Sequence, residues 1–277
     1  MESGARGVHR DQGLIFSELF QLAQHKRLCW AMALSDVRSR YAGSALGFVW
    51  AFVQPALTIA AYYLVFDVVF ALRAGADATA PKVGTYLIAG FLPWLAFCEG
   101  LSRGANGLLE SAHLLRKNAL PTVLPVARSV LTGGLIYLPL MILLTGVFVL
   151  WGSASWSALA LLPLMVLLYA AVFLSAYAWA ILIAAVRDAA QVQAFMLQIG
   201  VFLSPVLFPL SAFPENWRWL LYLNPASAPV QGVQAILLHD QYPPPVVWWV
   251  CLTWILVLAV VLELLLRRSA DELVDWL

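Results

Sequence analysis

Four polar residues with chemistry of their own stand directly before a long apolar run. The stretch SDVRSRY carries Asp36, Arg38, Arg40 and Tyr41, and the residues that follow, from about 45 to 72, are almost wholly apolar. The polar part favours water or phosphate, and the apolar part favours lipid. Anchoring to anionic lipid, or fixing the topology of the chain, is the simpler role for these residues.

Aromatic and amide side chains recur at helical spacing in two of the apolar segments. The first segment carries aromatic residues on one helical face, at Phe48, Phe52, Tyr62 and Phe66. Such rings can stack on the C–H face of a sugar, although packing or lipid contact is their commoner role. A later segment alternates amides and rings on one face, at Gln191, Phe195, Gln198, Phe202 and Pro205. Because an amide facing lipid is costly, that face predicts either an aqueous passage for a polar, uncharged polymer or hydrogen bonding between helices.

The sequence lacks the signatures of several enzyme and transporter classes. It has no G-x-x-x-x-G-K-[ST] phosphate loop, no H-E-x-x-H and no C-x-x-C, and its four histidines lack metal-ligand spacing. Almost no ionisable residue falls at mid-membrane depth, so coupling to protons or ions has little to act on. We therefore predict no catalytic residue, no metal site and no cofactor bound by this chain.

The elements that position these residues follow from a composition typical of membrane proteins. Of 277 residues, 62% are hydrophobic and 11% charged, with a mean hydropathy of +0.84; soluble domains are about a quarter charged. About 20 apolar residues cross the hydrocarbon as one helix. Six stretches reach this length, at about 45–72, 84–102, 121–151, 157–184, 191–210 and 246–266. We predict an all-α integral membrane protein with six transmembrane helices.

The basic residues divide unequally between the two sets of loops. Only Arg73, Lys82 and Arg218 of the 16 lysines and arginines fall in alternate loops, and the others lie on the side of the two termini. The positive-inside rule therefore predicts that both termini are cytoplasmic. The chain divides into a cytoplasmic N-terminus (1–44), a transmembrane domain (45–266) and a cytoplasmic tail (267–277).

Two cytoplasmic segments have patterns of their own. Residues 14–31 alternate apolar and polar positions at near-helical spacing, which predicts an amphipathic helix lying on the membrane surface, with an ordinary cytosolic helix as the alternative. Residues 104–119 predict a short helix with exposed leucines. Those leucines would either dock on a partner or fold back onto the membrane.

A proline-rich segment precedes the last apolar stretch. Within residues 213–239, short helices are predicted to begin near Pro214 and Pro229. Trp217 and Trp219 suit the outer membrane interface as aromatic anchors. Two half-inserted helices around the Asn224-Pro225 dipeptide would form a lid on the outer side.

Four stretches together resemble a known family. They are RSRYAGSALGFVWAFVQP (38–55), GFLPWLAF (90–97), LLRKNALPTVLPVAR (114–128) and FPENWRWLLYLNPASAPVQGVQ (213–234). In order and spacing the chain resembles, over about residues 13–268, the ABC-2 type permease subunits that export bacterial cell-surface polysaccharides such as O-antigen, capsule and teichoic acid.

The resemblance implies an assembly and a cargo. A homodimer would surround a channel in the bacterial inner membrane, paired with two copies of a separate ABC nucleotide-binding subunit that binds ATP and Mg²⁺. The cargo would be a glycan on a polyprenyl-diphosphate carrier, and no nucleic acid is involved.

The resemblance also implies roles for individual residues. Arg38, Arg40 and Tyr41 would meet the lipid-linked diphosphate at the inner mouth or contact the ATPase, although Ser35 and Ala42 stand where the family often has further basic residues. The aromatic and amide faces would line the channel. The residues that would couple to the ATPase are Leu108, Leu109, Glu110, Leu115 and Arg116. The residues that would form the outer gate are Trp217, Trp219, Asn224 and Pro225.

Two other functions remain open from the residues. An ABC-2 permease for a small drug or lipid would be expected to have a smoother apolar cavity than these amide and aromatic faces suggest. A membrane-embedded transferase would need a carboxylate or histidine at the membrane face, and Glu99 alone is a poor candidate.

Overall fold

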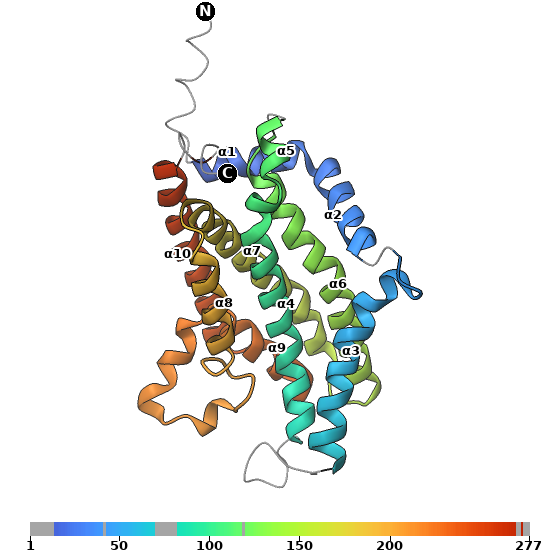
Figure 1. Cartoon of the computed structure of the whole chain (residues 1–277). Helices are drawn as coiled ribbons and strands as arrows, with labels where there is room; N and C mark the ends of the chain where they lie inside the picture. Colours follow the sequence, from blue (N-terminus) through green and yellow to red (C-terminus); the bar gives the residue numbers. More distant parts are fainter. Residues whose placement is uncertain (1–13, 41–42, 70–81, 118–119, 270–272, 274–277) are drawn as a thin grey trace, which may run out of the picture.

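The computed structural model describes residues 14–40, 43–69, 82–117, 120–269 and 273, and all regular elements within them are helices (Figure 1). Five helical stretches are long and apolar enough to span a membrane. They are α3 (Trp50–Tyr62) with the π-helical turn η2 (Tyr63–Val69), α4 (Val83–Glu110), α6 (Val123–Leu150), η3 (Trp156–Ala160) with α7 (Leu161–Ala185), and α10 (Pro245–Ser269). An all-helical membrane fold is thus confirmed.

The segment predicted as a fifth continuous span differs from the prediction. Helix α8 (Ala189–Gly200) has 12 residues, and turns follow from Val201 to Phe208. Pro205 explains the break, because proline lacks the N–H and clashes with the carbonyl four residues earlier. Residues 201–208, here called the broken segment, lead into the short 3₁₀ helices η4 (Leu210–Ala212) and η5 (Glu215–Leu223) and then α9 (Ser227–His239).

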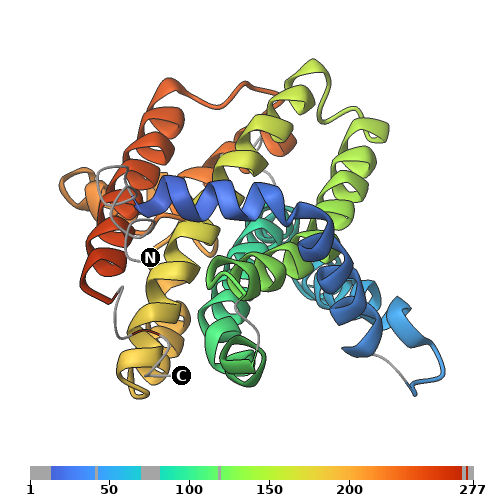
Figure 2. The same cartoon turned by 90° about the horizontal axis from the view of Figure 1, so that it is seen from above.

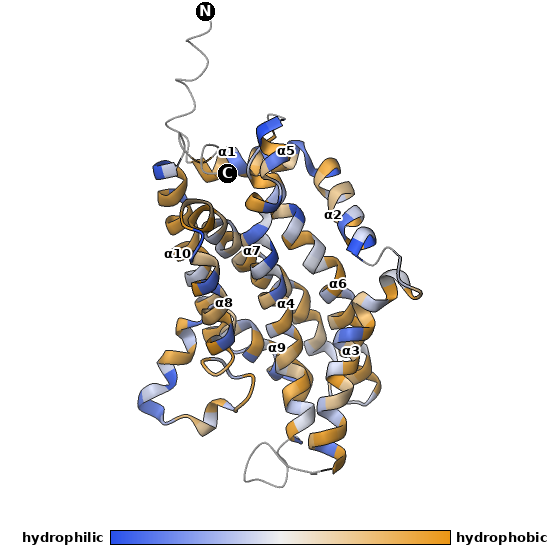
Figure 3. Cartoon of the chain, in the orientation of Figure 1, coloured by the Kyte–Doolittle hydropathy of each residue, from blue (hydrophilic) through white to orange (hydrophobic). Residues whose placement is uncertain are grey.

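Hydrogen bonds between distant parts of the chain identify the two ends of the bundle. At the α1 end, the backbone N–H groups of Leu14 and Ile15 donate to the carboxylate of Glu263 in α10, at 3.0 and 2.9 Å. At the opposite end, Asp240, just after α9, accepts hydrogen bonds from Ser155 and Ser157, in and after the α6–α7 connection. The five long helices run between these ends, and hydrophilic residues gather at α5 and the end of α2 (Figure 3).

The predicted amphipathic helix over 14–31 forms as two helices with a bend at His25. Helix α1 (Leu14–Gln24) lies across the end of the bundle (Figure 2), and α2 (Lys26–Arg40) continues from it. On α1, Phe16 and Phe20 are exposed, while Glu18 accepts a hydrogen bond of 2.9 Å from the Tyr177 hydroxyl of α7. Burial raises the pKa of Glu18, and this hydrogen bond only partly opposes the rise.

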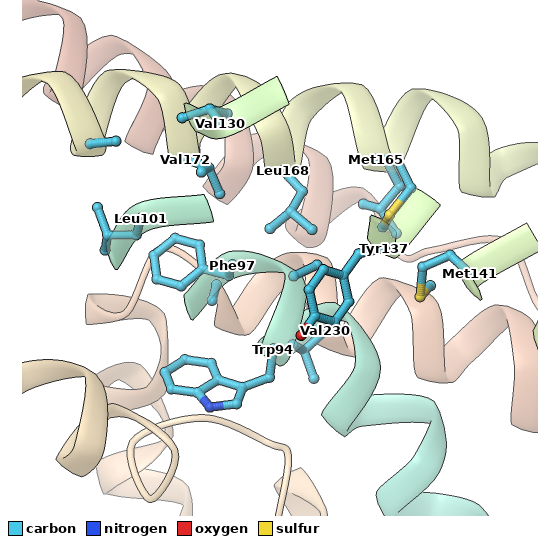
Figure 4. Packing of buried hydrophobic residues seen from close by; sticks show 14 of the residues in the cluster. Trp94, Phe97, Leu101, Val130, Tyr137, Met141, Met165, Leu168, Val172 and Val230 are labelled. Atoms are coloured by element: carbon cyan, nitrogen blue, oxygen red, sulfur yellow. The ribbon is translucent and has the colours of Figure 1, made fainter. Parts of the chain in front are cut away.

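Helix α4 is the centre of the hydrophobic core. It packs against α6, α7 and α9, and Trp94, Phe97 and Leu101 interlock with side chains from these neighbours (Figure 4). Small residues allow the close helix crossing, as a Cβ on Gly104 would lie 2.6 Å from the Ala176 Cβ. The core therefore fixes α4, whose remaining faces carry the polar groups described next.

Candidate functional site

A polar cavity of about 240 Å³ lies at the α1 end of the bundle. Its walls come from α2, α4 and α6, which contribute Asp36, Ser39, Arg40, Arg103, Glu110, Arg128, Ser129 and Thr132. We call it the arginine cavity, because three helices each contribute one arginine to it. Such convergence of guanidinium groups suits an anion with several oxygens.

Carboxylates balance the three arginines. Glu99 of α4 contacts two of them, since Arg40 Nη1 donates to Glu99 Oε1 at 3.0 Å and Arg103 Nε donates to the same oxygen. Arg128 Nε lies 3.0 Å from Asp36 Oδ2. With Glu110, the three carboxylates cancel the three positive charges, so the cavity is close to neutral as it stands.

Arg128 is the most buried of the three arginines, with 13% of its side chain exposed. Its Nε–H is close to Asp36 but is not directed at an acceptor, and its Nη2 lies 3.4 Å from Ser111 Oγ. A buried donor without an aligned acceptor is costly and is available to a ligand. Burial raises the pKa of Asp36, an effect that the positive charge of Arg128 only partly offsets.

A second, smaller cavity of about 150 Å³ adjoins this site. Arg40 lines both cavities, and Glu99 lines the smaller one with Gln54 and Thr58 of α3. The Arg40–Glu99 ion pair therefore lies where polar groups of α2, α3 and α4 meet.

Of the three residues predicted at the inner mouth, one is found in the arginine cavity. Arg40 lies in the arginine cavity, Arg38 is exposed and does not line it, and Tyr41 falls outside the described residues. Sequence reasoning missed the contribution of Glu99 and Arg103, although their i,i+4 spacing on one helix face was a readable signal.

The described rings of the aromatic stripe of α3 all contact other side chains. Tyr62 stacks against Phe66 with ring centroids 6.1 Å apart, and its ring is tilted against that of Phe91 of α4 at 5.1 Å. Phe52 is half-buried and packs on the core. Phe48 begins the stripe within the turn Gly47–Val49, and nothing is described of its side chain.

The amide and ring face of α8 points away from the rest of the chain. Gln191, Phe195 and Gln198 of α8 and Phe202 of the broken segment are exposed, whereas Pro205, predicted on the same face, is buried. The buried amide is Gln193, whose Nε2 donates to the Leu101 carbonyl at 3.2 Å. Within one protomer, hydrogen bonding between helices thus uses Gln193, and the predicted face is left open.

The segment predicted as one short helix over 104–119 is divided between two helices in the structure. Helix α4 ends at Glu110, and α5 (Ala112–Lys117) follows it. The exposure expected of Leu108 and Leu115 is wrong, because both are buried in the core. Leu109 is half-buried, and the exposed predicted residues are Glu110 and Arg116. Leu115 is buried because α5 packs against α4, and Leu108 is buried within α4 itself as part of the core.

At the opposite end, side chains satisfy the carbonyls that the broken segment frees. Tyr86 Oη donates to the Pro205 carbonyl at 2.6 Å and lies 3.1 Å from the Phe208 carbonyl. Gln234 Nε2 donates to the same Pro205 carbonyl at 2.8 Å, and Ser227 Oγ donates to the Leu203 carbonyl at 3.2 Å. Non-helical backbone inside a membrane protein requires such partners.

The predicted gate residues divide into two kinds. Trp217 and Trp219 on η5 are exposed, which agrees with an interface position. Asn224 is structural, because its Nδ2 donates to the Gly200 carbonyl at 2.9 Å and its Oδ1 accepts from the Ala226 N–H at 3.0 Å. Pro225 follows it and lines an apolar cavity of about 500 Å³ behind α8.

Comparison with known proteins identifies the class of this chain. Residues 27–238 match the model of the ABC-2 type transporter family, which is most of the chain. The protein belongs to that family.

Within this family, the chain is similar to proteins with a more specific name. The chain is 31% identical over 229 residues to the "O-antigen export system permease protein RfbA" of Myxococcus xanthus, a match that covers 80% of this chain and 85% of the relative. It is 22% identical over 197 residues to a protein of the same name from Klebsiella pneumoniae, covering 70% and 73% of the two chains.

Proposed function

We propose that this chain is the membrane subunit of an ATP-driven exporter that moves a polyprenyl-diphosphate-linked polysaccharide, such as an O-antigen, across the bacterial inner membrane. The observation that carries this proposal is the 31% identity, over 80% of the chain, to an O-antigen export permease. Partner subunits of the ABC type would bind ATP and Mg²⁺, and two copies of this chain would form the channel.

The channel assignment is supported by faces that one protomer leaves uncovered. The open face of α8, with Phe195 61% exposed, continues into Phe202 of the broken segment, which is 57% exposed. Together they combine amides and rings, which suit a polar, uncharged polymer. Most of α3 is also exposed in the single chain. A second copy placed against these surfaces would enclose a passage with Gln191 and Gln198 on its wall.

The arginine cavity supports a lipid-linked anion as cargo. In this proposal the α1 end is cytoplasmic, as the distribution of basic residues predicts, and the diphosphate approaches Arg40, Arg103 and Arg128 there. The same orientation turns α5 toward the ATPase. The passage through α8, the broken segment and α9 would be the sixth crossing, with η5 as an outer gate.

Depletion of the protein in its own host tests this function. Polyprenyl-linked glycan is extracted, and its side of the inner membrane is determined by protection from an added glycosidase. Finished polymer should accumulate on the cytoplasmic side while the surface loses it. Normal surface glycan would instead favour a drug or lipid permease, and unfinished precursor would favour a transferase.

A further inference from the structure

The arginine cavity holds one carboxylate that contacts two arginines from different helices. Glu99 of α4 accepts from Arg103 on its own helix and from Arg40 at the last residue of α2. From Cys29 to Val37, α2 packs along α6. The Arg40–Glu99 ion pair therefore ties the far end of α2 to α4.

Because the charges of the cavity are balanced, a bound anion must displace one of its carboxylates. Arg40, Arg103 and Arg128 are already neutralised by Asp36, Glu99 and Glu110. A diphosphate added to this set would leave an excess of negative charge in a partly buried site, which is unfavourable unless a carboxylate gives up its partner. Glu99 is the easiest to displace, because Arg40 and Glu99 are 40% and 28% exposed, and ion pairs of that exposure are weak.

We propose that Glu99 is an internal counter-ion that pairs with Arg40 and Arg103 while the site is empty and competes with the phosphate of the cargo for them. Phosphate oxygens accept from the planar guanidinium in pairs, so a diphosphate replaces the single Glu99 oxygen that Arg40 and Arg103 share. This inference rests on the proposed function, since it concerns the same anion site.

The variants Glu99→Gln and Glu99→Asp separate charge from shape. Glutamine keeps the size of the side chain and removes the competing charge, so inorganic pyrophosphate should bind about fivefold more tightly to the full-length variant in lipid nanodiscs. Aspartate keeps the charge and should leave the affinity near that of the wild type. Glu215→Gln, which removes a carboxylate paired with Arg218 far from the cavity, is the matched control and should change nothing.

Two results would overturn the inference and are distinguishable from each other. If pyrophosphate binds the wild type and all variants equally, the counter-ion role of Glu99 is wrong but the anion site stands. If pyrophosphate binds neither the wild type nor Glu99→Gln, the anion site itself is wrong, while the depletion experiment still judges export.

Discussion

The two ends of the bundle bury polar atoms in different ways. At the α1 end, arginines and carboxylates from three helices pair with each other through side chains alone. At the opposite end, hydroxyl and amide groups pair with backbone carbonyls of the broken segment. A carboxylate that loses its arginine can be replaced by another anion, whereas a carbonyl freed from a helix has no substitute in lipid.

The difference separates a site that can exchange partners from a segment that is held in place. The ion pairs of Glu99 are partly exposed, so their loss costs little stability. The groups around Pro205 are buried, so the loss of one leaves an unsatisfied polar atom. Substitutions at the opposite end should therefore lower stability, and substitutions at the α1 end should alter export with little change in stability.

Gly90→Ala should have the largest effect on stability. A Cβ there would lie 2.5 Å from Gln234 Nε2 and 3.3 Å from the Val206 Cα, so the amide must leave the Pro205 carbonyl. We expect a loss of about 2 kcal/mol, seen as a lower midpoint of thermal unfolding in detergent by circular dichroism. Gly146→Ala, where a Cβ meets nothing within 4 Å, is the control. Equal unfolding midpoints for the two variants would contradict the claim that the Gln234 amide stabilises the broken segment.

Tyr86→Phe should have the next largest effect. It removes the hydroxyl that donates to the Pro205 carbonyl and leaves the ring in place, for an expected loss of about 1 kcal/mol. Tyr169→Phe is the matched control, because the buried Tyr169 hydroxyl has no hydrogen-bond partner among the residues that the structure describes. If both substitutions lower the midpoint alike, the ring environment rather than the hydrogen bond is responsible.

Arg103→Gln should reduce export strongly and stability only slightly. Its ion pair with Glu99 is partly exposed, so the unfolding midpoint should fall by no more than the equivalent of about 1 kcal/mol. Export, measured as surface glycan, should fall strongly because the cavity loses one of its three cations. Arg267→Gln removes an arginine that also pairs with a glutamate at i,i+4 but does not line the cavity, and it should leave export intact. Normal export in Arg103→Gln would place the anion site elsewhere.

The membrane spans could be predicted from the sequence, but the broken segment and the arginine cavity could not. Five spans followed from hydropathy, because long apolar helices need no tertiary information. The break after Gly200 was missed because Pro205 lies in a stretch whose hydropathy alone suggests a span. Arg40 was predicted as a site residue, but its convergence with Arg103 and Arg128 depends on how three helices pack, which periodicity within one helix does not encode.

The gate shows the same limit. Asn224 was predicted as a gate residue from its place in the proline-rich segment, yet its contact with the Gly200 carbonyl depends on where α8 ends. Leu108 and Leu115 were expected to be exposed because the sequence does not show that α5 folds against α4.

Asp240 should give the smallest effect and the only one that depends on pH. Its carboxylate accepts from the Ser155 N–H at 2.7 Å and from the hydroxyls of Ser155 and Ser157 at 2.6 Å each. These hydrogen bonds hold its pKa below the usual aspartate value of 3.8. A lowered pKa in the folded state means that the stabilisation is present above the usual value and is lost as the pH falls through the lowered one.

Asp240→Asn removes this charge and keeps a residue that tolerates the left-handed backbone found there, with φ of +50°. The wild type should unfold at a slightly higher temperature than the variant at pH 7, and the gap should close as the pH falls below 3.8. A gap that stays constant across this range would show that the carboxylate charge contributes nothing. Asp240 is exposed, whereas the Tyr86 hydroxyl is buried. A small change in unfolding temperature for Asp240→Asn beside a large one for Tyr86→Phe would therefore show that the stability of the opposite end depends on the burial of its hydrogen bonds and not on hydrogen bonding alone.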